Sequence, residues 1–423
     1  MGNTLTRLAE QYPSLPPGVI LKTALLALGV RFDPLLPEAA RTALPDFRPH
    51  RLPDGTEVQI PYLMILEGGT LVRLRCREDS PFTVNRCDGR LHLFDKGEPV
   101  MPFTFAGRPD WHGRTSEDGT SLDACGLNQH GDMMVLNLAP ACEYWSTPWE
   151  GSPREGREVP GCSNIRSHRC AFCGYGLPDE RSRALGQKQG LPGVPRPVLQ
   201  RAAEAVRVGV ETGARHLYLT SGSMTNPDLE ADRFLSIVRG VRRASEGAYL
   251  AVGSQALPPE RLPGFKEAGA DGVCFNLEVW DRDVWERVCP GKARFIGREM
   301  WEESLVEAVG VFGEGNVFSA FVIGAEMVLD DALADPDDAM QSNIEGMQWL
   351  ISRGIHPILS LFWPFVGTDM EGAAGPDLHF LLRLFGTVNE VRRELNKPFP
   401  GNLACKRCLY MQVEGDFADS GEN

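Results

Sequence analysis

No apolar run in this chain of 423 residues is long enough to span a bilayer, and the chain starts without the basic and then hydrophobic pattern of a secretory signal. Basic residues are scarce: 43 of them stand against 57 acidic residues, which gives a net charge of −14. This balance argues against a general binder of nucleic acids or of anionic membranes. No internal repeat is evident. We therefore expect a cytoplasmic enzyme, long enough for two domains.

Cysteine, by contrast, is plentiful. Eleven cysteines in a chain without a secretory signal favour metal and redox chemistry over disulfides. Cys162, Cys170 and Cys173 lie in a segment from Gly161 to Gly176 that we expect to be a loop. Three thiolates can hold three irons of a cubane cluster and leave the fourth iron open to an exchangeable ligand. A structural zinc site and a chance grouping of buried thiols are the alternatives.

Around these cysteines the chain alternates between short apolar strands and amphipathic helices, which is typical of a parallel sheet built from strand-helix-strand units. The expected strands are Met133 to Leu138, His216 to Thr220, Tyr249 to Val252, Gly272 to Asn276, Val317 to Val322 and His356 to Phe362. The expected helices are Pro197 to Thr212, Asp228 to Ala244, Pro259 to Ala268, Arg298 to Phe312, Ser342 to Arg353 and Asp377 to Leu395. Six such units predict an open, partial barrel with its functional loops at the carboxyl ends of the strands.

The fold class predicted for the whole chain is therefore α/β, with three parts. Residues 1–131 read as a small mixed α+β domain, with an apolar helical stretch near Val19 to Gly29 and strand-like runs at Tyr62 to Leu66, Thr70 to Leu74 and Leu91 to Phe94. Residues 132–370 form the partial (β/α)6 barrel. Residues 371–423 form a helix and a cysteine-containing extension. A structural cover is the role we expect for the first part.

Polar residues follow several of these strands. These polar residues lie within the segments Thr220 to Met224, Asn276 to Glu278, Ile323 to Glu326 and Trp363 to Thr368. Taken with the cysteines, this order of features resembles the radical S-adenosylmethionine (SAM) superfamily from about Met133 to Thr368, and it is most similar to the biotin synthase and hydrogenase-maturase branch. The resemblance implies a 4Fe-4S cluster and SAM as cofactors.

In that resemblance, Cys162, Cys170 and Cys173 correspond to the cluster ligands. The family spacing is three and then two residues, whereas here it is seven and then two, so Cys142 is the alternative first ligand. We favour Cys162 because a short loop returns to one cluster more readily than a long one, although closure entropy grows slowly with length. Phe172 takes the aromatic position beside the adenine, where ordinary core packing is the alternative.

The resemblance also implies contacts to SAM from the strand ends. Ser221, Gly222 and Ser223 stand where the family commonly has Gly-Gly-Glu, whose backbone meets the methionine amino group, although the same residues suit a plain turn. Asn276 and Glu278 alternate on one strand and would bind the ribose, or else cap the next helix. Arg298 would meet the cofactor carboxylate unless it is a surface arginine. Gly324 would pack beneath the adenine.

Cys405 and Cys408 form a second Cys-x2-Cys pair near the carboxyl terminus. They could join Cys142 or Cys125 in an auxiliary iron-sulfur cluster, bind zinc, form a redox-active dithiol or remain inert. The histidines His112, His130 and His168 are scattered rather than spaced for a metal.

The activity implied by the resemblance is reductive cleavage of SAM at the cluster to a 5′-deoxyadenosyl radical, which abstracts hydrogen from a small-molecule substrate. A flavodoxin or ferredoxin-type protein would supply the electron, and the auxiliary cluster would serve sulfur insertion or electron relay. Maturation of a metallocofactor or methylation is the alternative within the superfamily. A non-catalytic iron-sulfur or zinc scaffold is the alternative outside it.

Overall fold

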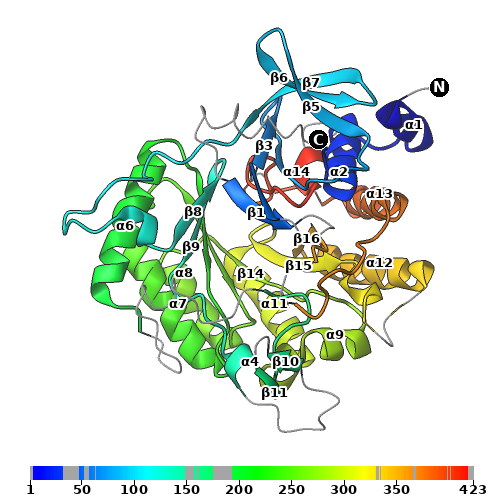
Figure 1. Ribbon diagram of the computed structural model, residues 1–423. Coiled ribbons are helices and arrows are strands. Elements are labelled where there is room, and N and C mark those ends of the chain that lie inside the picture. Colours follow the sequence, from blue (N-terminus) through cyan, green and yellow to red (C-terminus); the bar gives the residue numbers. More distant parts are fainter. Residues whose placement is uncertain are drawn as a thin grey trace.

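The computed structural model describes residues 3–31, 47–51, 57–61, 63–147, 157–159, 162–174, 193–329, 333, 335–364, 368–397, 399–400 and 402–417. Within them, a sheet of seven strands forms the centre of the molecule (Figure 1). Its order is β16-β15-β14-β13-β12-β9-β8. The strands are β8 (Leu127–His130), β9 (Met133–Asn137), β12 (His216–Thr220), β13 (Tyr249–Ser254), β14 (Gly272–Phe275), β15 (Val317–Ile323) and β16 (His356–Leu361).

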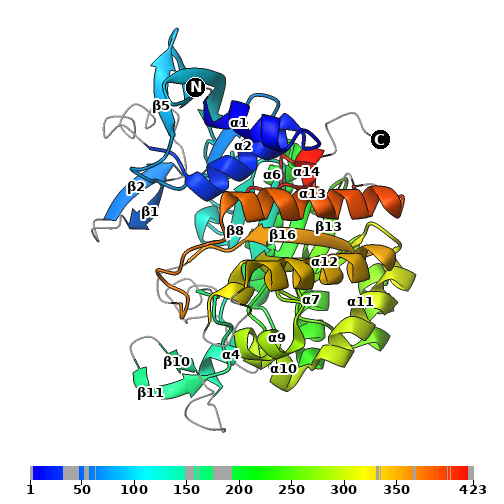
Figure 2. The same ribbon diagram turned by 90° about the vertical axis from the view of Figure 1, so that its right-hand side faces the viewer.

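Six of these strands, β9 and β12 to β16, are parallel, whereas β8 pairs with β9 in the antiparallel sense. Helices connect the parallel strands and pack on one side of the curled sheet (Figures 1 and 2). The connecting helices are α6 (Arg196–Glu211), α7 (Pro227–Val241), α8 (Leu262–Glu267), α11 (Arg298–Phe312) and α12 (Pro336–Ser352), and α13 (Leu378–Glu394) follows the last strand, β16. The predicted α/β partial barrel with six parallel strands is therefore confirmed, and β8 is an added edge strand that the sequence pattern did not predict.

Local sequence explains where several barrel helices begin. The side chain of Asn226 accepts from the Asp228 and Leu229 backbone N–H groups at the start of α7. Asp335 and Asp377 cap α12 and α13 in the same way. Each of these side chains satisfies a donor that the first turn of a helix leaves free. The caps therefore fix where each helix begins after the loop that follows the preceding strand.

Short elements gather at the carboxyl end of the barrel, in the lower part of both views (Figures 1 and 2). They are α4 (Glu143–Ser146), β10 (Arg157–Val159), β11 (Cys162–Ser167), α9 (Arg282–Val288) and α10 (Pro290–Phe295), with the 3-10 turns η3 (Pro259–Arg261) and η4 (Ala325–Met327) on other connections. β10 and β11 pair antiparallel. The segment expected to be one loop, Gly161 to Gly176, therefore contains a strand, because Cys162–Ser167 pairs with the residues before it.

The amino-terminal part combines helices with an antiparallel sheet. α1 (Thr4–Gln11) and α2 (Pro17–Leu28) pack beside a five-stranded sheet of order β4-β3-β7-β6-β5. Its strands are β3 (Leu63–Leu66), β4 (Leu71–Arg73), β5 (Phe82–Cys87), β6 (Arg90–Asp95) and β7 (Glu98–Phe105). A hairpin of β1 (Phe47–Arg51) and β2 (Glu57–Pro61) and the 3-10 turn η2 (Leu122–Ala124) complete it. The expected mixed α+β character is present, while α1, β1, β2, β5 and β7 went unpredicted.

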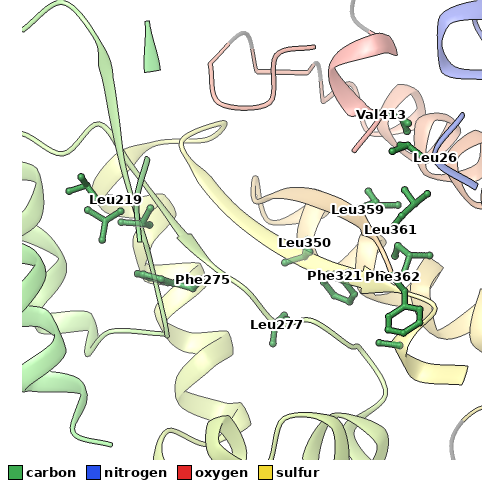
Figure 3. Packing of buried hydrophobic residues seen from close by; sticks show 14 of the residues in the cluster. Leu26, Leu219, Phe275, Leu277, Phe321, Leu350, Leu359, Leu361, Phe362 and Val413 are labelled. Carbon is green, nitrogen blue, oxygen red and sulfur yellow. The ribbon is translucent and has the colours of Figure 1, made fainter. Parts of the chain in front are cut away.

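The carboxyl-terminal segment 402–417, which ends in α14 (Glu414–Phe417), joins the barrel to the amino-terminal part. The ammonium group of Lys22 on α2 donates to the Leu409 carbonyl at 2.8 Å and pairs with the Asp416 carboxylate at 2.9 Å. Figure 3 shows Val413 beside Leu26 and close to the side chains of β16. The segment thus lies at the end of the barrel opposite to α4.

In the described part of the chain, no helix has both the length and the apolar character needed to cross a membrane.

Candidate cofactor site at the carboxyl end of the barrel

Three cysteines line one cavity of about 160 Å³ at the carboxyl end of the barrel: Cys142, Cys170 and Cys173. Cys142 follows β9, whereas Cys170 and Cys173 follow β11, and none of the three forms a disulfide in the described part of the structure. The hollow between them is also lined by residues that follow β12, β13 and β14. The sheet topology explains this convergence, because the carboxyl ends of neighbouring parallel strands meet at the same edge.

A close backbone approach holds the Cys142 loop. The Gly222 N–H donates to the Ala139 carbonyl at 2.7 Å, and the Glu143 N–H donates to the Ser223 carbonyl at 2.8 Å. A Cβ atom at Gly222 would lie 2.3 Å from the Ala141 carbonyl oxygen, which is closer than real Cβ atoms come to any neighbour. Glycine at position 222 is therefore required for the two loops to stack, and this stacking sets the position of the Cys142 thiol.

The loop that carries the other two thiols is fixed from both sides. The Ala171 N–H donates to the Val288 carbonyl at 2.8 Å, and the Asp369 N–H donates to the Ala171 carbonyl at 3.1 Å. The buried Arg169 guanidinium pairs with the Asp369 carboxylate and lies 4.9 Å from the centre of the Trp145 ring. The Cys173 N–H donates to the Cys170 carbonyl, so the Cys-x2-Cys turn is closed on itself.

The thiols are close enough to influence one another electrostatically. Burial raises the pKa of Cys142 well above its usual range, and the neighbouring Cys173 and Cys170 raise it further. Such thiols stay protonated at neutral pH unless a cation replaces their protons, because a thiolate in an apolar site needs a compensating charge. A set of soft donors around a hollow therefore fits an iron-sulfur cluster.

A fourth thiol, that of Cys289, lies next to Cys170 but outside the lining of the cavity. It is fully buried at the start of α10, and burial and a side-chain hydrogen bond with Cys170 raise the pKa of Cys289. Sequence reasoning passed over Cys289 because it stands alone, far from the other cysteines in the chain.

A buried ion pair forms the opposite side of the cavity. Lys292 on α10 pairs with the Glu278 carboxylate at 2.7 Å and donates to the Asn276 carbonyl at 2.6 Å. Burial raises the pKa of Glu278, and Lys292 opposes that rise. Burial alone would lower the pKa of Lys292, but Glu278 and the nearby thiols of Cys289 and Cys170 raise it overall. Each group of the pair thus favours the charged form of the other, while burial still shifts Glu278 toward its neutral form.

Behind Cys142, a hydrogen-bonded network of buried side chains supports the loop. The Tyr144 hydroxyl donates to the Gln255 side-chain oxygen, and the Gln255 amide donates to the Met224 carbonyl at 2.9 Å. The carboxyl group of Glu230 accepts from the Met224 and Gln255 backbone N–H groups at 2.6 and 3.1 Å. Burial raises the pKa of Glu230 to about 7. The ends of β12 and β13 are thus tied to α4.

Six of the eight residues predicted to bind SAM line this cavity together with the thiols. They are Phe172, Ser221, Gly222, Ser223, Asn276 and Glu278. Arg298 lines a different hollow, where its guanidinium lies between Trp280 and Trp285 and donates to Glu302. Gly324 is covered by Pro376, so it does not face the cavity either. The structure does not bring these two residues to the candidate site.

Cys162 was predicted to be the first cluster ligand, with Cys142 as the alternative. Cys142 lies in the cavity with Cys170 and Cys173. Cys162 opens β11, and its side chain lies outside the described part of the structure. Backbone hydrogen bonds of its loop hold Cys142 beside Cys170 and Cys173, although it is distant from them in sequence. Loop length alone did not indicate this.

The second cysteine pair lies elsewhere. Cys405 and Cys408 contact His216, the first residue of β12, at the amino end of the barrel. Cys142 lies near the carboxyl ends of the same strands, and Cys125 is buried in the main core. The structure therefore does not bring Cys142 or Cys125 to this pair.

Several residues of the cavity wall were missed by the sequence reasoning. They are Tyr144, Trp145, Tyr218, Gly253, Ser254, Gln255 and Lys292. Ser254 and Gln255 could have been found, because they are polar residues at the end of an apolar strand. Lys292 gave no such signal, since it lies on a short helix within the connection between β14 and β15.

No protein-family profile matches the chain. A curated relative, the bacteriochlorophyllide c C-7(1)-hydroxylase of Chlorobaculum limnaeum, is 22% identical over 380 residues, which cover 84% of this chain and 85% of the relative. Among solved structures, coproporphyrinogen III oxidase (HemN) from Escherichia coli, whose title calls it a radical SAM enzyme, is 11% identical, covers 65% of this chain and 55% of its own, and has a TM-score of 0.36. Methylornithine synthase (PylB) is 14% identical, covers 61% of this chain and 74% of its own, and has a TM-score of 0.34.

Three features point to the same family: the order of cysteines and strand-end residues in the sequence, the curled sheet with six parallel strands, and the thiols gathered at its carboxyl edge. In these features the chain resembles the radical S-adenosylmethionine superfamily.

Proposed function

We propose that this protein cleaves SAM reductively at a 4Fe-4S cluster held by Cys142, Cys170 and Cys173, and that the resulting radical abstracts hydrogen from a small-molecule substrate. The observation that carries the proposal is the convergence of these thiols on one cavity. When bound, the cluster and SAM would supply the electron transfer and the carbon-centred radical. The protein would bind, orient and shield them.

The remaining wall of the cavity suits the other groups of SAM. The Glu278 carboxylate can accept from a ribose hydroxyl, and the Asn276 amide can donate to one, since its oxygen already accepts from the Ala320 N–H and the Cys274 thiol. The backbone of Ser221 to Ser223 offers carbonyl groups to the methionine ammonium, and Phe172 offers an aromatic surface to the adenine. Arg298 has no part in this proposal, because its guanidinium is engaged away from the cavity.

Lys292 would have two roles. It opposes the effect of burial on Glu278 and so favours the ionised carboxylate, whose two oxygens are both acceptors. It also ties Glu278 to the backbone of Asn276, which fixes the strand end that faces the ribose. The buried position of the pair keeps water from competing for these hydrogen bonds.

The outcome at the substrate is a second question. The curated relative that covers most of this chain is named as a hydroxylase of a chlorophyllide. This likeness favours hydroxylation of a carbon on a tetrapyrrole as the outcome, ahead of sulfur insertion, methylation or maturation of a metallocofactor. The electron would come from a flavodoxin or ferredoxin-type donor. Water would supply the oxygen atom and release a proton, and the substrate radical would return one electron to the cluster.

Anaerobic reconstitution tests the proposal. We expect about four iron and four sulfide ions per chain at the site, and release of 5′-deoxyadenosine from SAM when dithionite is present. Metal binding without cleavage of SAM would instead support a non-catalytic scaffold. Incubation with chlorophyllides then tests hydroxylation, through a product that gains one oxygen atom.

Serine variants separate the two candidates for the first ligand. We expect Cys142→Ser to abolish the cluster absorbance and the release of 5′-deoxyadenosine, as Cys170→Ser and Cys173→Ser should. Cys162→Ser should retain both. Cys87→Ser is the matched control, because Cys87 is a partly exposed thiol on β5, in the amino-terminal sheet. The opposite pattern for Cys142 and Cys162 would contradict the assignment.

A further inference from the structure

Inside the barrel, below the cofactor cavity, one histidine and two cysteines come together in a group that could hold a metal ion. Along β12, His216, Tyr218 and Thr220 alternate with fully buried leucines and so share one face of the sheet. Tyr218 and Thr220 line the cofactor cavity, so His216 lies on the same side at the opposite end. Thr220 lies four positions after His216 on the strand, which is about 13 Å.

Two thiols of the carboxyl-terminal segment approach this histidine. The Nδ1 atom of His216 lies 2.8 Å from the Cys408 Sγ atom and 4.0 Å from the Cys405 Sγ atom. The two Sγ atoms are 2.8 Å apart, and both cysteines are free. The three ligand atoms all lie within 4.8 Å of one another. Segments almost 190 residues apart thus place one nitrogen and two sulfurs around a single point.

We propose that His216, Cys405 and Cys408 bind one zinc ion, separate from the cluster at the carboxyl end. Imidazole nitrogen and thiolate sulfur are the donors that zinc prefers, and a Cys-x2-Cys turn is a common way to supply two of them. This proposal does not depend on the proposed function, since it concerns other residues at the other end of the barrel.

The distances suit a mononuclear ion. With zinc bonds of about 2.3 Å to sulfur and 2.0–2.1 Å to nitrogen, a tetrahedral site separates two sulfurs by about 3.8 Å and a sulfur from a nitrogen by about 3.6 Å. The Cys405 to His216 distance of 4.0 Å is close to this value. The other two distances, each 2.8 Å, need to widen by about 1 Å, which rotation of the Cys405 side chain and a small shift of Cys408 can supply.

An iron-sulfur cluster fits this place poorly. Thiolates are the main ligands of iron-sulfur clusters, and the cavity at the carboxyl end offers three of them, whereas the described residues bring together only two thiols and one imidazole here. The surroundings are also filled by apolar side chains. They are Met133, Ala251, Phe318, Ala320, Ile358, Leu403, Ala404 and Leu409, which pack with Cys408 as one cluster.

Water would be the fourth ligand of the zinc ion. Asp132, the acidic residue directly before β9, is not counted as a fourth ligand, because its carboxylate already accepts from the Nε and Nη2 groups of Arg407. Cys405 is partly exposed, so solvent can reach the site from its side. Three protein ligands and a water are a common coordination set for zinc.

Such an ion would fasten segment 402–417 under the barrel. The Tyr218 side chain lines the cofactor cavity above and packs against the apolar cluster below. The metal site therefore supports the floor of the cavity from beneath. It would work together with Lys22, which holds Leu409 and Asp416 farther along the same segment.

Metal analysis of the full-length protein tests the proposal. We expect about one zinc per chain in the wild type, and the same content in the variant Cys142→Ala/Cys170→Ala/Cys173→Ala, which lacks the cluster ligands. His216→Gln and Cys405→Ser should each lose most of the zinc. Chelation should lower the Tm of the wild type, and added zinc should restore it. Cys274→Ser is the matched control, because Cys274 lies in the same apolar cluster but outside the donor set; it should retain zinc.

Three results would overturn the proposal. One is iron with acid-labile sulfide that persists at this site in the variant without the cluster ligands. Another is a metal-free wild type whose Cys405 and Cys408 form a disulfide, as thiol titration would show. The third is zinc retained in His216→Gln and in Cys405→Ser. Because every readout here is metal content, thiol state or Tm, none of them depends on cleavage of SAM.

Discussion

The ammonium group of Lys292 lies 2.7 Å from the Glu278 carboxylate and 4.7 Å from the centre of the Trp301 ring, inside the barrel and on the wall of the cofactor cavity. Glu278 itself adopts a positive φ of 72°, which non-glycine residues rarely do. A strained backbone and a buried ion pair at one strand end indicate that the position of this carboxylate matters to the site.

Replacing Lys292 by methionine should damage both stability and binding. The change leaves the Glu278 carboxylate buried without its cation, so we expect the free energy of unfolding to fall by about 3 kcal/mol or more. The affinity for SAM should fall by about tenfold or more, because a protonated Glu278 offers fewer acceptors to the ribose. Chemical denaturation and equilibrium binding of SAM to the reconstituted protein measure the two effects.

The double variant Lys292→Met/Glu278→Gln serves as the control for this prediction. Removing both charges should recover most of the lost stability but not the affinity for SAM. If the double variant bound SAM as the wild type does, the role of Glu278 in binding would be refuted.

Gly222→Ala should displace the Cys142 loop. The new Cβ atom would meet the backbone of Ala141 and Cys142 at 2.3–2.5 Å, and backbone atoms cannot move aside as the end of a side chain can. We expect a lower content of iron after reconstitution and a lower Tm. Gly310→Ala is the matched control, because a Cβ atom there meets nothing within 4 Å; on helix α11 it should leave iron content unchanged and stability equal or slightly higher.

Arg298 provides a contrast to Lys292. Its guanidinium donates to Glu302 at 2.6 Å and to the Val279 carbonyl at 3.2 Å, and it lies between two tryptophan rings. Arg298→Met should therefore lower the Tm, since the buried Val279 carbonyl loses its donor. The affinity for SAM should stay within about twofold of the wild type. A large loss of affinity in a variant that still folds would mean that Arg298 reaches the cofactor after all.

The barrel was predictable because each of its parallel strands is an apolar run bounded by turns, and each long helix carries one apolar face. His216 to Thr220 matches β12 to the residue for this reason. The same periodicity misses β8, whose Asn128 and Gln129 interrupt the apolar pattern at the sheet edge. Local pattern predicts elements well where burial of one face decides them, and less well at edges.

The site was predictable where its residues directly follow a strand. Asn276 and Ser221 are such residues, and both line the cavity. Lys292 could not be found in this way, since its place depends on how α10 folds back over β14. The approach of His216 to Cys408 was equally hidden, because it depends on the path of the last segment beneath the barrel. Contacts of this kind are set by tertiary packing, which spacing along the chain does not encode.

Glu414 predicts a pH dependence of stability that one variant should remove. Its carboxyl group is buried against β16, where one oxygen accepts from the Leu359 N–H, and burial raises its pKa from 4.5 to about 7. Between pH 4.5 and 7 the folded state holds a proton here that the unfolded state has released, so this group's contribution to stability falls as pH rises through that window and is constant above it.

Glu414→Gln is uncharged at every pH and has nearly the same shape. The variant should match the wild type near pH 4.5 and exceed it by about 3 kcal/mol at pH 8, which is the free energy that corresponds to a shift of this size. Urea denaturation of both proteins at pH 4.5, 6 and 8 measures the difference. A difference that stays constant over this range, or that grows toward low pH, would show that Glu414 is already ionised in the folded protein at pH 4.5.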